Sequence, residues 1–126
     1  MSYIKSIKKR LQPERQERMA FMEWVKLNPQ IRDYLIAIPN EGKRNIITAM
    51  NLKRMGMTAG IPDYFLMIPN QTNHGLWIEF KAGKNKLTHA QEAFFATAKY
   101  QGYECTVVYS AKEAIDEIKR YLKSGL

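Results

Sequence analysis

Asp63, Glu79 and Lys81 are the residues whose types and spacing could do chemistry. Glu79 and Lys81 lie in the apolar segment 76–82, which alternates as a β-strand does, so both side chains leave the strand on one face. Asp63 begins a second apolar segment, residues 63–68, and the three charged groups converge if these two segments pair as a hairpin. Two carboxylates beside a lysine form a donor set that suits Mg²⁺ and the hydrolysis of phosphodiester bonds.

The pattern Glu-x-Lys is weak on its own, because it occurs three times in this chain. Glu41-Gly42-Lys43 falls in a polar loop, and Glu117-Ile118-Lys119 falls in a helical pattern, where residues two apart do not face each other. Only Glu79-Phe80-Lys81 lies in an alternating strand that follows a second strand introduced by Pro62-Asp63. A solvent-facing pair of charges on an edge strand is the alternative to a catalytic site.

The size and charge of the chain indicate a single globular domain that binds polyanions. With 126 residues the chain is expected to form one domain, and its 45% hydrophobic and 25% charged residues are ordinary for a globular protein. The net charge of +8 and the pI near 9.6 favour encounters with polyanions, as in nucleic-acid-binding proteins. We expect a cytoplasmic protein, because no apolar run could span a membrane and no secretory segment opens the chain. The single cysteine, Cys105, fits a reducing compartment and is expected in the core.

Local patterns predict an α/β domain, residues 13–126, after a basic N-terminal arm, residues 1–12, that is either flexible or a short helix. Helices are predicted at 13–27, 45–55, 88–101 and 110–123, and strands at 34–38, 63–68, 76–82 and 103–109. Pro13 would lie in the first turn of its helix, and the strand 34–38 would be buried. The middle two strands can form an antiparallel hairpin, whereas strands separated by helices need crossovers and some parallel pairing. The prediction is a small mixed β-sheet flanked by helices.

A longer ordered set of residues surrounds the candidate site. It comprises Pro13-Glu14 with Trp24, residues 37–40 with Gly42 and Arg44, residues 53–63, residues 74–81, Leu87-Thr88 with Gln91, and Gly102-Tyr103. This set resembles the PD-(D/E)XK nuclease superfamily, whose core is restriction-endonuclease-like, and within it the virus-type replication-repair nuclease (VRR-NUC) family in its small stand-alone phage form. The resemblance covers residues 13–122. Glu41 and Asn85 replace glycines of the family, and Arg18 replaces a glutamine, so no role is carried over to position 18.

The resemblance implies roles for the strand residues. Asp63 and Glu79 would bind Mg²⁺, for which Mn²⁺ could substitute, with the backbone carbonyl of Phe80 as a further ligand. Lys81 would orient the attacking water or stabilise charge on the phosphate.

Two further residues are implied near the metal. Glu14 would approach it directly, through water or at a second metal, although an ordinary acidic residue in the first turn of a helix has the same signature. Gln91 would border the site, yet a capping box with Thr88 accounts for it equally well.

Basic and histidine residues complete the candidates. Lys43, Arg44, Lys84 and Lys86 are candidate phosphate contacts at the rim of the site, although charged runs are often only solvated. His74 and His89 lack the spacing of metal ligands and are expected in turns or on the surface.

The expected function is that of a metal-dependent endonuclease that hydrolyses DNA, with the resemblance pointing to branched or Holliday-junction DNA in phage replication or repair. The alternative is a DNA- or RNA-binding module of the same fold that does not cleave. The resemblance also implies a homodimer, since a pair of sites could serve the two arms of a junction. Apolar patches for pairing are expected on the methionine-rich first helix or on the last helix at Ile115, Ile118 and Leu122, unless these stripes face the core.

Overall fold

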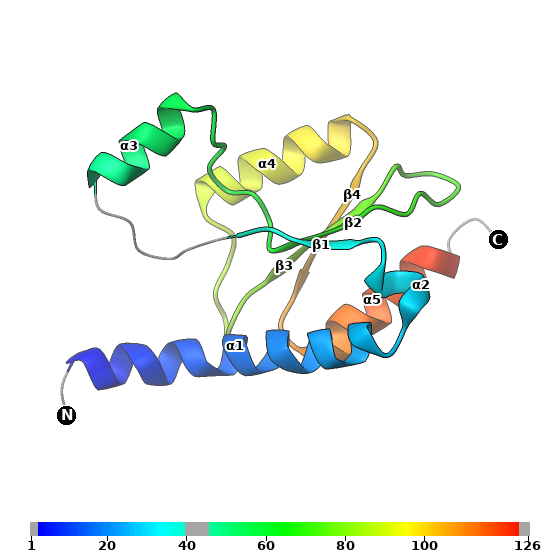
Figure 1. The fold of residues 1–126 in the computed structure, drawn as a ribbon, viewed down its shortest axis with the longest axis horizontal. Coiled ribbons are helices and arrows are strands. Elements are labelled where there is room, and N and C mark those ends of the chain that lie inside the picture. The colour runs from blue at the N-terminus through cyan, green and yellow to red at the C-terminus, as the bar shows by residue number, and fades with distance from the viewer. Residues whose placement is uncertain (1–2, 40–45, 124–126) are drawn as a thin grey trace.

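The structure, a computed structural model, describes the backbone of residues 3–39 and 46–123 and the side chains of residues 13–39 and 49–123. In chain order the elements are α1 (Tyr3–Lys26), α2 (Pro29–Arg32), β1 (Leu35–Ala37), α3 (Ile46–Arg54), β2 (Tyr64–Leu66), β3 (Leu76–Phe80), α4 (His89–Tyr100), β4 (Glu104–Val108) and α5 (Ala111–Lys123). Figure 1 shows α1 and α5 on one side of the strands and α4 on the other. The predicted α/β class, with helices flanking a small sheet, is confirmed.

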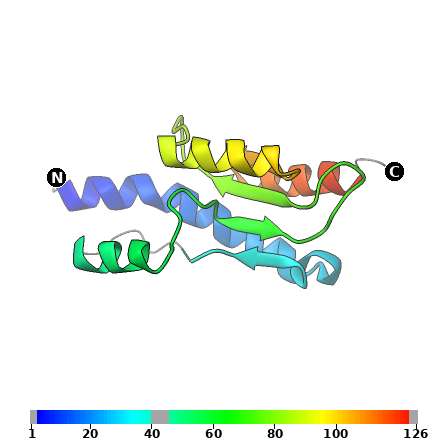
Figure 2. The same cartoon turned by 90° about the horizontal axis from the view of Figure 1, so that it is seen from above.

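The four described strands form one mixed sheet in the order β1-β2-β3-β4. Figure 2 shows β1, β2 and β3 side by side in this order. β1 pairs with β2 and β2 with β3 in antiparallel fashion, whereas β3 and β4 are parallel. The predicted hairpin and the parallel crossover through α4 are therefore both present.

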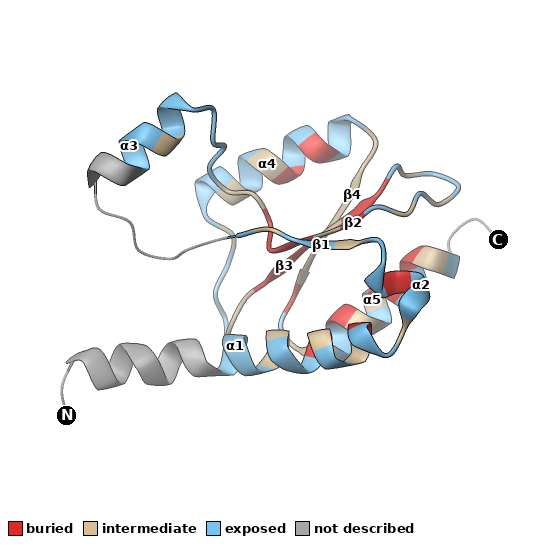
Figure 3. Cartoon of the chain, viewed as in Figure 1, coloured by how far each residue is buried: buried red, intermediate tan, exposed pale blue. Residues whose placement is uncertain are grey.

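The two faces of the sheet pack differently. Leu76, Ile78 and Phe80 of β3 are buried against α1 and α5, whose Phe21 and Ile118 belong to the same core cluster (Figure 3). On the opposite face, Trp77 lies between Phe65 of β2, whose ring is tilted to it, and Phe94 of α4, which meets it edge-on, with ring centroids 4.4 and 4.9 Å away. Because alternate residues of β3 serve opposite faces, Glu79 lies on the α4 side of the sheet, as its alternation with the core residues predicted.

The first helix is longer than predicted. It begins at Tyr3 rather than at Pro13, which lies inside it. Residues 3–12 contain no glycine or proline and are rich in good helix formers, so the helix continues through the single hydrogen bond that Pro13 cannot donate. The prediction of a first-turn position for Pro13 is wrong, and Glu14 accordingly lies in the middle of α1. A short helix, α2, follows at Pro29 and was not predicted.

The first strand is an edge strand, not the buried strand that was predicted. Ile36 is 39% exposed, because β1 has a neighbour on one side only, within the described sheet. A short apolar run alone does not distinguish an edge strand from a central one. The other predicted strands are shorter at their ends, and α3 ends before Gly56, whose φ of 92° suits a left-handed stop.

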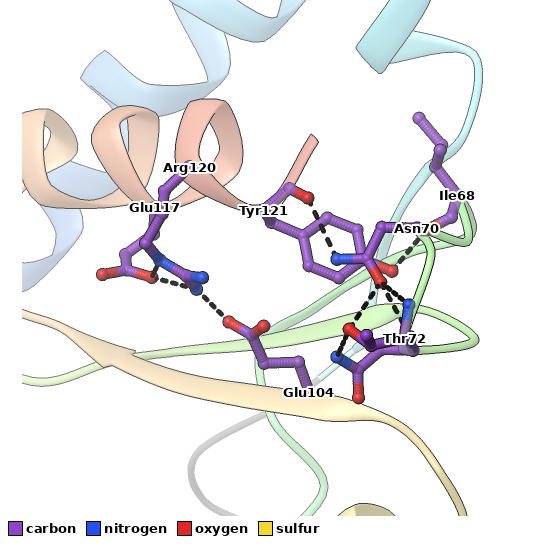
Figure 4. A network of polar contacts seen from close by, with 8 residues as sticks. Ile68, Asn70, Thr72, Glu104, Glu117, Arg120 and Tyr121 are labelled. Atoms are coloured by element: carbon purple, nitrogen blue, oxygen red, sulfur yellow. Dashed lines mark hydrogen bonds and ion pairs between the residues drawn. The ribbon is translucent and has the colours of Figure 1, made fainter. Parts of the chain in front are cut away.

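Polar contacts tie the connection between β2 and β3 to the last helix (Figure 4). The Tyr121 hydroxyl donates to the Ile68 carbonyl at 2.6 Å, and the Asn70 side-chain amide donates to the Tyr121 carbonyl at 3.0 Å. Arg120 pairs with Glu104 of β4. These contacts hold the connection after β2 and the start of β4 against α5. None of the helices within the described ranges has the length and apolar character needed to cross a membrane.

Candidate active site

The start of β2 and the end of β3 bring Asp63 and Glu79 together. Tyr64 is paired with Ile78 in the antiparallel ladder, so the residue before Tyr64 lies opposite the residue after Ile78. Both carboxylates are buried, Asp63 at 2% exposure and Glu79 at 4%. They line a cleft of about 640 Å³ that α1 closes on one side, with Lys81 and Gln91 in its wall. Figure 1 shows the chain leaving β3 beside the middle of α1 before it continues to α4.

The carboxylate of Asp63 is held by the hairpin itself. Its Oδ2 accepts a hydrogen bond from the backbone N–H of Phe80 at 2.9 Å. Its Oδ1 lies 3.5 Å from Nη1 of Arg18, which reaches over from α1. Oδ2 is thus fixed by the backbone of β3, whereas Oδ1 faces the long, flexible side chain of Arg18.

The carboxylate of Glu79 has one oxygen with a hydrogen-bond partner and one orphan oxygen, which lacks a partner among the described residues. Its Oε2 accepts from Nε2 of Gln91 at 3.1 Å and lies 3.7 Å from Nζ of Lys81. Its Oε1 is buried and has no hydrogen-bond partner among the described residues. Burial and then the charge of Asp63 raise the pKa of the Glu79 carboxyl from 4.5 to about 7, against the opposing charge of Lys81.

Gln91 is both a capping-box residue and a residue at the border of the site, the two roles predicted for its position. Its backbone N–H and its Oε1 form the capping box with Thr88, at 3.2 and 2.9 Å, which opens α4. Its remaining donor, Nε2, is the one that reaches Glu79. The amide therefore joins the first turn of α4 to the carboxylate.

Gly60 allows this first turn to lie against the loop that delivers Asp63. Its φ is 81°, and a Cβ at this position would overlap the carbonyl group of Ala90 and approach the Gln91 nitrogen to 2.7 Å. Only glycine combines this backbone conformation with so close an approach. The Gly60-Ile61-Pro62-Asp63 segment thus positions Asp63 and Gln91 with respect to each other.

The long first helix contributes two residues on one face, Glu14 and Arg18, which are four positions apart. Burial in the cleft, followed by the charge of Asp63, raises the pKa of the Glu14 carboxyl, while Arg18 and Lys81 lower it. The alternative of a first-turn helix residue is wrong for Glu14, because the helix begins at Tyr3.

Arg18 was assigned no role from the sequence. Its Nε donates to the Tyr64 hydroxyl at 3.2 Å, and its guanidinium carbon lies 5.1 Å from the centroid of the Tyr64 ring. The i, i+4 spacing from Glu14 was a signal that could have found it, but only once a helix through both positions was certain.

The donor set fits a small divalent cation. Asp63 and Glu79 are two adjacent carboxylates, and the buried orphan Oε1 of Glu79 requires a partner. Within the described residues, no three or more His, Cys, Asp and Glu side chains gather closely enough to hold a metal. Mg²⁺ commonly binds through one or two carboxylates and keeps several waters, so two protein carboxylates are sufficient.

Comparison with known proteins now identifies the domain. A family model of the VRR-NUC domain matches residues 1–112. The chain belongs to the VRR-NUC family. A solved structure described as a "VRR_NUC domain protein" is similar, with a TM-score of 0.78 and 30% sequence identity over 90% of each chain. Among curated proteins, none matches this chain.

Family membership confirms the resemblance drawn from the motifs. The mixed sheet with its flanking helices is the PD-(D/E)XK type of fold, and a VRR-NUC domain is a nuclease-type domain. In this VRR-NUC protein Pro-Asp directly precedes β2 and Glu-x-Lys ends the adjacent strand β3, as the motif order predicted.

Other candidates are distributed around the VRR-NUC cleft. Lys84 and Lys86 are exposed in the turn between Lys81 and α4, next to the cleft but not in its wall. Lys43 and Arg44 lie outside the described residues. His74 packs edge-on against Tyr103 at a centroid distance of 5.5 Å, and His89 is exposed at the first position of α4.

Proposed function

We propose that the protein is an Mg²⁺- or Mn²⁺-dependent endonuclease that hydrolyses phosphodiester bonds of DNA. The observation that carries this proposal is the convergence of two buried carboxylates, one with an orphan oxygen, beside a lysine in a cleft of a basic VRR-NUC protein. Burying two adjacent carboxylates destabilises a fold unless cations or hydrogen bonds compensate their charges, so such a pair in a cleft is a candidate functional site.

In this proposal Asp63 and Glu79 would hold the metal, with the Phe80 carbonyl as a third protein ligand. A bound divalent cation would neutralise a phosphate oxygen and lower the pKa of a water molecule. Asp63 Oδ2 stays on the Phe80 N–H and Glu79 Oε2 stays on Gln91, so the oxygens offered to the cation are Oδ1 and Oε1. The fold therefore presents one oxygen from each strand.

Lys81 and Glu14 act beside these ligands. Nζ of Lys81 lies 3.7 Å from Glu79, which supports a role beside the reacting phosphate, where its charge would orient the attacking water or stabilise negative charge. Glu14, which lies in the wall of the cleft, would bind a metal-bound water or a second cation. Gln91 fixes the orientation of the Glu79 carboxylate.

For substrate and assembly, we propose branched or Holliday-junction DNA, a role in phage replication or repair, and a homodimer. Ile118 of α5 is fully buried and Ile115 and Leu122 pack against the core, so this apolar stripe faces the core rather than a second copy. An apolar groove of about 420 Å³ on the α4 face, lined by Ile36, Phe65 and Trp77 among others, is open and could receive a second copy.

The test is a cleavage panel with labelled linear, nicked, flap and four-way DNA and single-stranded RNA, each with EDTA, Mg²⁺ or Mn²⁺. Metal-dependent cutting that is fastest on four-way DNA supports the full proposal. Binding without cutting in every metal supports the alternative, a binding module of the same fold. Light scattering of the free protein and of its DNA complex determines whether the active particle is a dimer.

A further inference from the structure

Arg18 makes two contacts of different kinds in the cleft. Its Nε is held by a 3.2 Å hydrogen bond to the Tyr64 hydroxyl, with the guanidinium over the Tyr64 ring. Its Nη1 approaches Asp63 Oδ1 to 3.5 Å, well beyond the 2.7–2.9 Å or so of a charge-assisted hydrogen bond. The Tyr64 contact is thus an anchor, and the Asp63 contact is a loose ion pair.

The loose contact occupies the oxygen that a cation would need. Asp63 Oδ2 is taken by the Phe80 N–H, and the Asp63 side chain is only 3% exposed, so Oδ1 is its available oxygen. A divalent cation between Asp63 and Glu79 therefore has to replace the guanidinium at Oδ1, because two cations cannot share one oxygen at this distance without strong repulsion.

The cleft wall contains as many acidic as basic residues. Its acidic residues are Glu14, Glu23, Asp63 and Glu79, and its basic residues are Arg15, Arg18, Lys26 and Lys81. A bound divalent cation adds two positive charges, so the cleft then attracts a phosphate group. An arginine released from Asp63 would lie in this positive cleft with both Nη groups free to form the paired hydrogen bonds that suit phosphate.

We propose that Arg18 is an exchangeable counter-ion: it neutralises Asp63 in the metal-free protein, yields Oδ1 to the metal, and then contacts the phosphate of the DNA while Tyr64 keeps hold of its Nε. This inference rests on the proposed function. It concerns a side chain to which the sequence alone assigned no role.

The first test is the affinity for Mn²⁺ alone, measured by titration calorimetry without DNA. Arg18→Gln should bind Mn²⁺ about tenfold more tightly than the wild type, because the metal no longer competes with a guanidinium. Arg15→Gln is the matched control: it removes the same charge from the same cleft wall, and Arg15 makes no ion pair with any described side chain. It should strengthen binding by no more than about twofold.

The second test is DNA affinity in Ca²⁺, under conditions in which no cleavage occurs. Arg18→Gln should weaken DNA binding by about tenfold and Arg15→Gln by less, because only Arg18 contacts the phosphate next to the metal. A purely structural role would weaken metal and DNA binding together. Arg18→Lys, which keeps the charge, should retain Mn²⁺ affinity within about threefold of the wild type, and it serves as the readout if Arg18→Gln does not fold.

The outcomes separate the two claims. If wild type and Arg18→Gln bind Mn²⁺ with equal affinity, the counter-ion inference is overturned while the metal site stands. If neither binds Mn²⁺ or Mg²⁺, the proposed function fails and the inference with it. If Arg18→Gln gains metal affinity but keeps full DNA affinity, the phosphate contact is overturned.

Discussion

At the scale of single residues, each of the two carboxylates has one oxygen held by a hydrogen bond and one that is not. Asp63 uses Oδ2 to accept from the backbone of Phe80, and Glu79 uses Oε2 to accept from Gln91. The second oxygen of each faces a long ion pair or no described partner at all. The fold thus fixes the orientation of both carboxylates but leaves one oxygen of each without a close hydrogen-bond partner among the described residues. Without a ligand, this lowers the free energy of unfolding.

This cost predicts a pH-dependent gain in stability for Glu79→Gln in metal-free buffer. The folded-state pKa of Glu79 is raised from 4.5 to about 7, so the unfolded chain loses this proton at lower pH than the folded protein does. The charged carboxylate therefore destabilises the fold increasingly as pH rises from 4.5 through 7. Urea unfolding with EDTA should show that Glu79→Gln gains about 1–3 kcal/mol more at pH 8 than at pH 5.

The control for this measurement is Glu92→Gln, which removes an exposed carboxylate from the first turn of α4. Its effect should differ by less than about 0.5 kcal/mol between the two pH values. An equal gain for Glu79→Gln at pH 5 and pH 8 would contradict the idea that a buried charge is being removed.

At the scale of elements, the strands and caps that build the site were predictable because their signals are local. The alternation in residues 76–80 identified both the core face and the face that carries Glu79. The spacing of Thr88 and Gln91 predicted the capping box that begins α4. The side-chain contact from Gln91 to Glu79 depends on how α4 crosses the sheet, so only the family resemblance suggested it.

The features that escaped prediction depend on tertiary context. Pro13 predicts a helix start because its ring favours a first turn, whereas the good helix formers before it extend α1 back to Tyr3. The exposure of β1 could not be known without its neighbours. Arg18 is recognisable only after α1 is placed against Tyr64 and Asp63.

The packing of the Gly60 loop on α4 yields a prediction at this scale. Gly60→Ala should lower the free energy of unfolding by about 2–4 kcal/mol and reduce cleavage as well, because a Cβ would push the loop away from Ala90 and shift Asp63 from Gln91. Gly56→Ala is the matched control, since its φ is 92° but a Cβ there meets nothing within 4 Å. It should cost only about 1 kcal/mol of backbone strain and leave the position of Asp63 unchanged. Equal losses for both variants, by urea unfolding, would show that φ alone matters.

At the scale of the whole molecule, the charge of +8 predicts that DNA affinity falls steeply with salt. Replacing Lys84 and Lys86 by glutamine should weaken binding and reduce the slope of log affinity against log salt by about one to two. The same two charges removed from α5 by Lys112→Gln and Lys119→Gln provide the comparison. If both double variants have the same slope, the turn before α4 is not where the DNA backbone lies.

The central claim is that Asp63, Glu79 and Lys81 form a metal-dependent hydrolytic site. It is tested most directly by single-turnover cleavage of saturating DNA in Mg²⁺ by Glu79→Gln, with Glu117→Gln as the control. Glu117 belongs to the second Glu-x-Lys that the structure describes, but it lies on α5 and pairs with Arg120 outside the cleft. Glu79→Gln should cleave at least about a hundredfold more slowly than the wild type while still binding DNA. The same result is expected for Asp63→Asn and Lys81→Ala. Glu117→Gln should cleave within about twofold of the wild-type rate. Cleavage by Glu79→Gln at the rate of Glu117→Gln would contradict the assignment.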